Sequence, residues 1–285
     1  MKSIWAQNIW LQPQWIEANS IGHAAKELRS RHRLWWPYSV SHHRRTQLIQ
    51  DALPHVSGKR AVFSSSPVHV DVAPPGSWPV GQLGSWSLFE RGLVLASAQC
   101  TSHRPNGTWE FVEDKAGPPS RAYLKLWELF SRLDVRPRAG TSCLDVGSSP
   151  GGWTWALAQL GCAVLSVDRS ALHQSVQRLP GVRFVSGDAF QAVPSRHPEV
   201  DWVFSDVVCY PERLYGWVQT WLSSRPRNFV CTIKLQGTDH CPWIDKFRRI
   251  PESTVLHLYH NKHELTWVCL LHSASTQRVH EHALA

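Results

Sequence analysis

The chain has 285 residues, of which 42% are hydrophobic and 18% are charged, and its formal net charge is +8. This balance excludes an intrinsically disordered chain, because disordered proteins combine low hydrophobicity with high charge, and the length suffices for one large domain or two unequal ones. No segment has the roughly 18 consecutive apolar residues of a membrane-spanning helix, so we expect a cytoplasmic protein.

The seven cysteines include no Cys-x-x-Cys pair. Both a disulfide framework and a structural zinc site are therefore disfavoured, and we expect reduced thiols and no bound metal. Most of the basic residues are arginine, whose planar guanidinium suits phosphate groups. A polyanionic partner is favoured, although composition alone does not distinguish it from a solvated basic surface.

The first 60 residues carry nine lysine or arginine residues against three acidic ones. Apolar spacing predicts a helix at 21–34, and the aromatic residues Trp35, Trp36 and Tyr38 follow it. Short apolar runs at 68–72 and 93–98, separated by glycine- and proline-rich turns, predict strands. We therefore expect residues 1–114 to form a small α+β module with a basic face.

A proline-rich joint, Gly117-Pro-Pro119, marks the predicted domain boundary, and Ser120 is placed to cap the helix that follows it. From 115 to 285 helices and strands alternate, as in a doubly wound α/β domain with a mostly parallel sheet. The last two strands flank Asn261-Lys-His263, which predicts an antiparallel hairpin at the sheet edge. We predict helices at 121–133, 153–160 and 171–179, and strands at 142–146, 163–168, 182–186, 200–205, 228–234, 254–259 and 265–271.

The most specific motif is Cys143-Leu-Asp-Val-Gly-Ser-Ser-Pro-Gly-Gly-Trp153, an apolar strand that ends in a glycine-rich turn and opens a helix. Its glycines permit close backbone approach, and the start of the helix directs free N–H groups at an anion. We expect this anion to be the methionine carboxylate of S-adenosylmethionine, with Asp145 at the same end of the cofactor. The candidate cofactor residues in the turn are Gly147, Ser149, Pro150, Gly151, Gly152 and Trp153.

A nicotinamide-binding Rossmann loop is the competing interpretation of this turn. Such a loop needs Gly-x-Gly-x-x-Gly spacing, which is absent, and Pro150 suits a loop around a sulfonium amino acid better than one around a diphosphate. Two further acids follow successive strands. Asp168 is placed to accept hydrogen bonds from the cofactor ribose and Asp188 from the adenine amino group, so a methyltransferase is favoured.

Residues 115–271 resemble the FtsJ/RrmJ-like family of ribose 2′-O-methyltransferases, in particular its M-type branch that acts on large-subunit ribosomal RNA. The resemblance rests on Pro119-Ser-Arg-Ala-Tyr-Leu-Lys-Leu126, Leu144-Asp-Val-Gly-Ser-Ser-Pro-Gly-Gly-Trp153, Phe204-Ser-Asp206, Thr232-Ile-Lys234 and His257-Leu-Tyr-His-Asn-Lys-His-Glu-Leu-Thr266. It implies a Rossmann-like methyltransferase fold, an RNA substrate and a catalytic tetrad. Carried over by motif, the tetrad is Lys125, Asp206, Lys234 and Glu264.

A ribose hydroxyl is a weak nucleophile, so an enzyme must align it with the methyl group and remove its proton. Lys234 is the candidate base, and burial and the like charge of Lys125 are expected to lower its pKa, while Asp206 and Glu264 oppose this. In the alternative division of roles, Lys234 stays protonated and only steers the hydroxyl. Two other functions remain open, a methyltransferase of a non-RNA substrate and a catalytically idle RNA-binding module.

The basic module at 1–114 is the candidate RNA-binding part, because its arginines are interleaved with aromatic residues. Within the methyltransferase motifs, Tyr123, Trp153 and Tyr210 are candidates for stacking on a base of the substrate.

Overall fold

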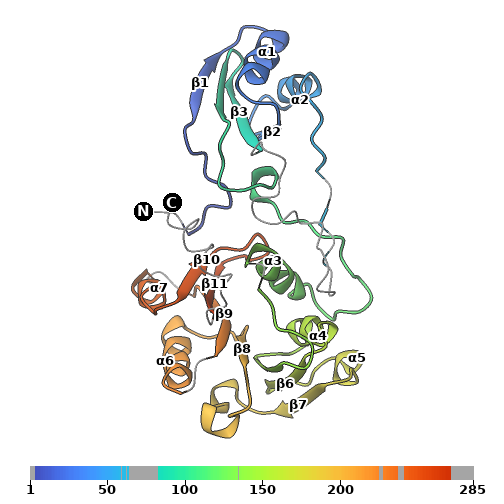
Figure 1. The fold of residues 1–285 in the computed structure, drawn as a ribbon, viewed down its shortest axis with the longest axis vertical. Helices are drawn as coiled ribbons and strands as arrows, with labels where there is room; N and C mark the ends of the chain where they lie inside the picture. The colour runs from blue at the N-terminus through green and yellow to red at the C-terminus, as the bar shows by residue number, and fades with distance from the viewer. Residues whose placement is uncertain are drawn as a thin grey trace. The chain divides into compact units, whose positions relative to one another are not determined.

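The computed structural model describes residues 4–58, 60, 61, 63, 83–133, 135–224, 227–236 and 241–270. They form two compact units, one built mainly from residues before 113 and the other mainly from residues after it (Figure 1). The strand predicted at 68–72 lies outside the described residues. Within the described part of the chain, no helix has both the length and the apolar character needed to cross a bilayer.

The first unit is an α+β module built on a four-stranded sheet in the order β1-β4-β3-β2. The hairpin of β3 and β4 is antiparallel, β1 pairs antiparallel with β4, and β2 runs parallel to β3. The helix predicted at 21–34 ends at Arg31, and Ser20 caps its start by accepting the N–H of His23. The elements are β1 (Gln14–Glu17), α1 (Ile21–Arg31), β2 (Trp35–Pro37), α2 (His43–Asp51), β3 (Gly84–Glu90), β4 (Leu93–Ser97) and a 3-10 turn, η1 (Pro105–Gly107).

Two tryptophans form the centre of this unit's core. Trp35 and Trp86 are fully buried, together with apolar residues of both helices. The indole of Trp35 donates to the carbonyl of Leu28 at 2.9 Å, and the indole of Trp86 donates to the side chain of Gln50 at 3.1 Å. Each indole N–H therefore has a partner inside the core, which burial of a tryptophan requires.

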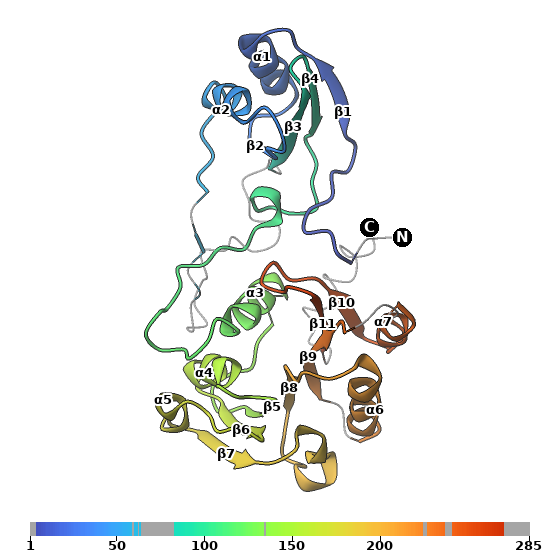
Figure 2. The same cartoon turned by 180° about the vertical axis from the view of Figure 1, so that it is seen from behind.

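The second unit has a seven-stranded sheet in the order β10-β11-β9-β8-β5-β6-β7. Five neighbouring strands, from β9 to β7, are parallel, and β11 is antiparallel to both β9 and β10. In Figures 1 and 2 α3, α4 and α5 lie on one side of the sheet and α6 and α7 on the other. This is the predicted α/β Rossmann-like methyltransferase fold, and the predicted antiparallel hairpin at the sheet edge is confirmed.

The strands of this unit are β5 (Ser142–Val146), β6 (Ala163–Asp168), β7 (Val182–Ser186), β8 (Trp202–Ser205), β9 (Asn228–Lys234), β10 (Ser253–Leu256) and β11 (Glu264–Cys269). Its helices are α3 (Tyr123–Leu133), α4 (Gly152–Gln159), α5 (Gln174–Gln177), α6 (Pro211–Leu222) and α7 (Cys241–Arg248), with 3-10 turns η2 (Ala189–Gln191) and η3 (Pro194–Arg196).

The predicted elements differ from the observed ones mainly in the helices. Strands β5, β6, β7 and β9 have the predicted bounds, whereas the helix predicted at 171–179 is the single turn α5. Helices α6 and α7 were not predicted. Ser120 does not cap α3, because its hydroxyl accepts the N–H of Ala122, which precedes the first helical residue.

The two tryptophans of the first unit that differ most in burial give a matched test of its core. Replacing Trp86 with alanine removes a buried side chain and its hydrogen bond, so we expect a loss of about 3–5 kcal/mol in the stability of this unit. Trp15, which is 56% exposed, serves as the control, and Trp15→Ala should have little effect. Amide hydrogen exchange at 84–97 measures the stability of this unit in both variants. Equal protection in the two variants would contradict a core built around Trp86.

Candidate active site

Four charged side chains form a closed ring at the carboxyl ends of the central strands. The Lys125 ammonium lies 3.0 Å from Asp206 and 2.5 Å from Glu264. The Lys234 ammonium lies 2.6 Å from Asp206 and 2.6 Å from Glu264. Positive and negative groups therefore alternate around the ring, and each one contacts two of the opposite sign. The structure thus brings together the four residues that the sequence nominated.

The strand order explains why residues so distant in sequence meet. Asp206 directly follows β8, Lys234 is the last residue of β9, and these parallel neighbours end at the same edge of the sheet. Because β11 runs antiparallel to β9, its first residue, Glu264, pairs directly with Lys234. Helix α3 adds Lys125. The topology of the sheet therefore sets the position of three of the four groups.

Burial makes the charges of the ring interact strongly, because the four side chains are only 10–16% exposed. Burial alone would raise the pKa of Asp206, but the neighbouring ammonium groups of Lys125 and Lys234 outweigh it and lower that pKa. Burial would likewise lower the pKa of Lys234, but Asp206 and Glu264 outweigh it and raise that pKa. The sequence left open which of these opposing effects is larger; in the resting protein the carboxylates outweigh burial, and the raised pKa keeps Lys234 charged.

The glycine-rich turn between β5 and α4 has a backbone that other residues would not tolerate. Gly147 has a φ of +71°, and a Cβ atom at this position would lie 2.5 Å from Val207. Gly151 has a φ of +113°, and a Cβ atom on Gly152 would lie 2.5 Å from the hydroxyl of Ser120. The peptide bond between Ser149 and Pro150 is cis. The turn thus keeps its backbone free of side chains at the start of α4.

Asp145, the acid at the end of this strand, is fully buried beside the turn. One of its carboxylate oxygens accepts the hydroxyl of Thr154 at 2.7 Å, and the other has no hydrogen-bond partner among the described residues. Burial raises the pKa of Asp145 to about 7, although the hydrogen bond from Thr154 acts in the opposite direction. A buried acceptor without a partner suits a site that a polar ligand completes. Thr154, one turn into α4, was not foreseen as its partner.

Asp168 and Asp188 lie at the ends of β6 and β7, as predicted, and both already have partners. Asp168 accepts the N–H of Ser149 at 3.0 Å and that of Ser170 at 2.9 Å, so it ties the glycine-rich turn to the next strand. Asp188 accepts the N–H of Phe190 at 2.9 Å. Its carboxylate also pairs with the exposed guanidinium groups of Arg169 and Arg213, at 2.5 and 3.4 Å.

The sequence did not single out these two arginines, although Arg169 directly follows Asp168 and could have been noted for that reason. Arg213 comes from the first turn of α6, which was not predicted, and no local pattern pointed to it.

The aromatic candidates separate clearly by burial. Tyr123 and Trp153 are 1% and 3% exposed, and the indole of Trp153 donates to the carbonyl of Ala122 at 3.0 Å. Their rings belong to the core, so these two candidates are not exposed to stack on a base of the substrate. Tyr210 is 65% exposed and lies four residues after Asp206. Of the three, only Tyr210 remains available to a substrate.

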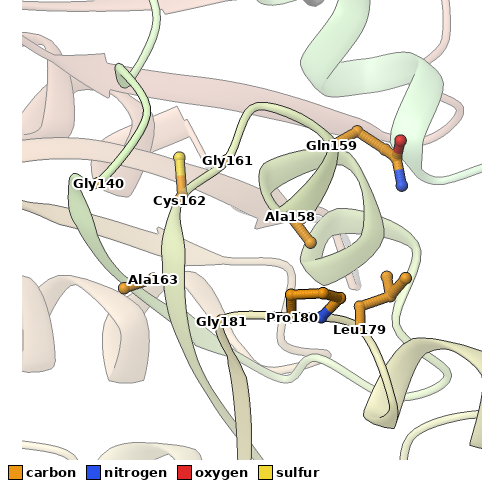
Figure 3. A pocket seen from close by; sticks show the side chains of 9 residues that line it. All are labelled: Gly140, Ala158, Gln159, Gly161, Cys162, Ala163, Leu179, Pro180 and Gly181. Atoms are coloured by element: carbon orange, nitrogen blue, oxygen red, sulfur yellow. The ribbon is translucent and has the colours of Figure 1, made fainter.

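A shallow pocket of about 320 Å³ lies at the opposite, amino-terminal edge of the sheet (Figure 3). Gly140, Cys162 and Gly181 line it, near the starts of β5, β6 and β7, and it contains none of the candidate site residues. Among the described residues, no cluster of three or more histidine, cysteine or acidic side chains could hold a metal ion. The buried cysteines at 100, 143, 162, 209, 231 and 269 are free thiols.

Comparison with known proteins identifies the second unit. Residues 118–234 match the model of the FtsJ-like methyltransferase family. Curated relatives named ribosomal RNA large subunit methyltransferase M include one from Azoarcus sp. (strain BH72), 31% identical over 165 residues, which are 52% of this chain and 45% of the relative. The relative of the same name from Aromatoleum aromaticum is 32% identical over 173 residues, 55% of this chain and 46% of its own. The chain thus spans about half the length of the curated relatives it matches.

Among solved structures, the fibrillarin pre-rRNA processing protein of Methanococcus jannaschii matches 50% of this chain and 73% of its own, with 18% identity and a TM-score of 0.40. The family match covers the glycine-rich turn, Lys125, Asp206 and Lys234 within one continuous stretch. The second unit of this chain is therefore an FtsJ-like methyltransferase domain, similar to the M-type ribosomal RNA methyltransferases, and its cofactor is S-adenosylmethionine.

Proposed function

We propose that this protein is an RNA 2′-O-methyltransferase that acts on ribosomal RNA. The observation that carries the proposal is the ring of Lys125, Asp206, Lys234 and Glu264 in a methyltransferase domain. Relatives named as methyltransferases of large-subunit ribosomal RNA support this class of substrate. The ring suits a hydroxyl nucleophile, because it offers both hydrogen-bond donors to the oxygen and acceptors for its proton.

When bound, S-adenosylmethionine would supply an electrophilic methyl group, and the residues of this chain would orient the ribose hydroxyl toward it. Asp206 and Glu264 fix the two lysines by hydrogen bonds. Lys234 would take the proton that the ribose hydroxyl loses, while the methyl group exchanges its bond to sulfur for one to oxygen and the neutral thioether leaves. Lys125 stays protonated, so that one positive charge remains to stabilise the oxygen.

For Lys234 to act as the base, it must first lose the proton that it carries in the resting ring. Its raised pKa makes this step unfavourable at neutral pH, and the neutral fraction grows as the pH rises. The proposed mechanism therefore ties the rate to the charge of Lys234. If Lys234 instead stays protonated and steers the hydroxyl, the rate does not follow this titration.

Groups of this chain that suit S-adenosylmethionine lie at the same edge of the sheet. We propose that the N–H groups at the start of α4, near Gly152 and Trp153, face the methionine carboxylate, because a helix start favours an anion. Gly147, Ser149, Pro150 and Gly151 shape the turn, and the free oxygen of Asp145 accepts from the methionine ammonium. Asp168 accepts hydrogen bonds from the ribose hydroxyls, and Asp188 accepts one from the adenine amino group.

We further propose that residues 1–114 bind the RNA and that residues 115–285 carry out the methyl transfer. Exposed basic side chains on or beside the helices of the first unit, at Lys26, Arg29, Arg33 and Arg44, support binding to a phosphate backbone. In the second unit, the exposed ring of Tyr210 supports stacking on a base near the target ribose.

Removing the amine of Lys234 should abolish most of the methyl transfer. We expect Lys234→Ala to lower the rate at least about 100-fold, the size of a lost general base, with labelled methyl counted on total RNA and 2′-O-methylated nucleosides identified after digestion. Lys246→Ala is the matched control, because Lys246 is an exposed lysine on α7 that packs over Trp243. Methyl groups found only on bases, or no labelling of any RNA class, would contradict the proposal.

The pH dependence of the rate tests the role of Lys234. Because the pKa of Lys234 is raised, the wild-type rate should keep rising with pH well above neutrality. The groups that face Lys234 are Asp206, Glu264, Lys125 across the ring, and more weakly Cys209. Glu264→Gln removes one charge that raises this pKa, so the rising limb should move to lower pH. A flat profile in both proteins would assign Lys234 the steering role instead.

Asp145→Asn should weaken cofactor binding and yet stabilise the domain at alkaline pH. The pKa of Asp145 is about 3.8 when solvated and about 7 in the fold. The protonated carboxyl therefore makes its whole contribution to the free energy of unfolding below pH 3.8, and this contribution is lost as the pH rises to 7. The asparagine never ionises. The difference in the free energy of unfolding between Asp145→Asn and the wild type should be absent near pH 3.8. It should reach up to about 4 kcal/mol in favour of the variant above pH 7, as measured by thermal unfolding.

The control for this test is Asp245→Asn, on the exposed part of α7. It should change neither cofactor binding nor the pH dependence of unfolding. A wild-type protein whose stability does not fall between pH 4 and 7 relative to Asp145→Asn would contradict the raised pKa.

A further inference from the structure

One face of α3 carries three charged residues that all contact the segment 257–264. Lys125, Glu128 and Arg132 are spaced by three and four positions, so they lie on the same side of the helix. Lys125 pairs with Glu264 as part of the ring. Glu128 and Arg132 have no place in the ring, yet both bind the chain that leads into it.

Glu128 is fully buried and uses both carboxylate oxygens on this segment. One oxygen accepts the N–H of Tyr259 at 2.7 Å and the other accepts the N–H of His260 at 3.0 Å. Arg132 lies 2.5 Å from the same carboxylate and donates to the carbonyl of His257 at 3.5 Å. Two side chains from one helix thus bind three backbone groups of this segment, one carbonyl and two N–H groups, outside the strands of the sheet.

Burying this carboxylate is costly for the fold. Burial raises the pKa of Glu128, and the Arg132 guanidinium and the two N–H groups oppose this only in part. An apolar side chain of similar volume at this position would often be as stable or more stable than a buried ion pair. The charge is therefore better explained by what it holds in place than by a contribution to packing.

The held segment leads directly to the ring. Only residues 261–263 separate His260 from Glu264. Leu258 and Asn261 are buried, and the Asn261 amide donates to Thr266 at 3.1 Å, so the segment is fixed on both sides of the bonds to Glu128. Glu264 must reach two ammonium groups at 2.5 and 2.6 Å, and a shift of about 1 Å can cost two orders of magnitude in rate.

We propose that Glu128, supported by Arg132, is a positioning residue that fixes the segment 257–263 and thereby places the Glu264 carboxylate between Lys125 and Lys234. The effect of Glu128 on catalysis rests on the proposed function. Its binding to the backbone of residues 257–263 does not depend on that function.

The test is Glu128→Gln, which keeps the shape of the side chain. A glutamine offers one acceptor oxygen, so its amide N–H₂ must face one of the two backbone N–H groups, and the ion pair with Arg132 is lost. We expect kcat to fall about 10- to 100-fold, while S-adenosylmethionine binds within about twofold of the wild type. The rising limb of the pH profile should move to lower pH, because a displaced Glu264 no longer raises the pKa of Lys234 as strongly.

Val218→Ala is the control for a general loss of stability. Val218 is fully buried in α6 and is not a member of the ring, so this variant should lower the unfolding temperature without moving the pH profile. If Glu128→Gln behaves in the same way, with kcat and the pH limb unchanged, Glu128 is only structural and the inference is overturned.

Amide hydrogen exchange at Tyr259 and His260 gives a readout that needs no activity. Both amides should exchange faster in Glu128→Gln than in the wild type and in Val218→Ala. Unchanged exchange overturns the inference whatever the rates show. If the wild-type protein methylates no RNA, the proposed function fails, and the exchange experiment still decides whether Glu128 holds the segment.

Discussion

The alternation of two amines and two carboxylates at the sheet edge is the interaction on which the rest of the methyltransferase unit depends. Each group is largely removed from water, and each contacts two neighbours of opposite sign. Removal of one member leaves an unbalanced buried charge, which costs far more than the pair contributes. The strand order, the glycine-rich turn and the hold on the segment 257–263 can all be understood as ways of bringing these charges together.

The sequence predicted the sheet well because its strands are short apolar runs bounded by turn residues. β5 and β6 have the predicted bounds, since each ends at an acid or glycine that breaks the run. Helices α6 and α7 were missed although a local signal was present. The buried residues Leu214, Trp217, Val218 and Trp221 of α6 recur at helical spacing.

In the candidate site, local sequence motifs predicted which residues are present but not the contacts that each side chain makes. Motif positions identified the members of the ring, but the direction of the shift in the pKa of Lys234 depends on distances that no pattern contains. Tyr123 and Trp153 illustrate the reverse error, because an aromatic residue within a motif looks the same whether its ring faces a ligand or the core. Glu128 went unnoticed for a related reason, since its partners are backbone groups 131 and 132 positions away.

Glu264 pairs directly with Lys234 across β11 and β9, so the register of these strands determines which side chain lies opposite this lysine. Side chains alternate between the faces of a strand, so a slip of one position would place His263 or Leu265 opposite Lys234 and turn the acid to the other face. Such a slip would leave the number of hydrogen bonds in the sheet nearly unchanged, yet it would exchange an anion for an imidazole or an aliphatic chain. Insertions or deletions in the turn that enters β11 would for this reason disturb the ring of charges together with the packing of this strand, whose side chains are all buried.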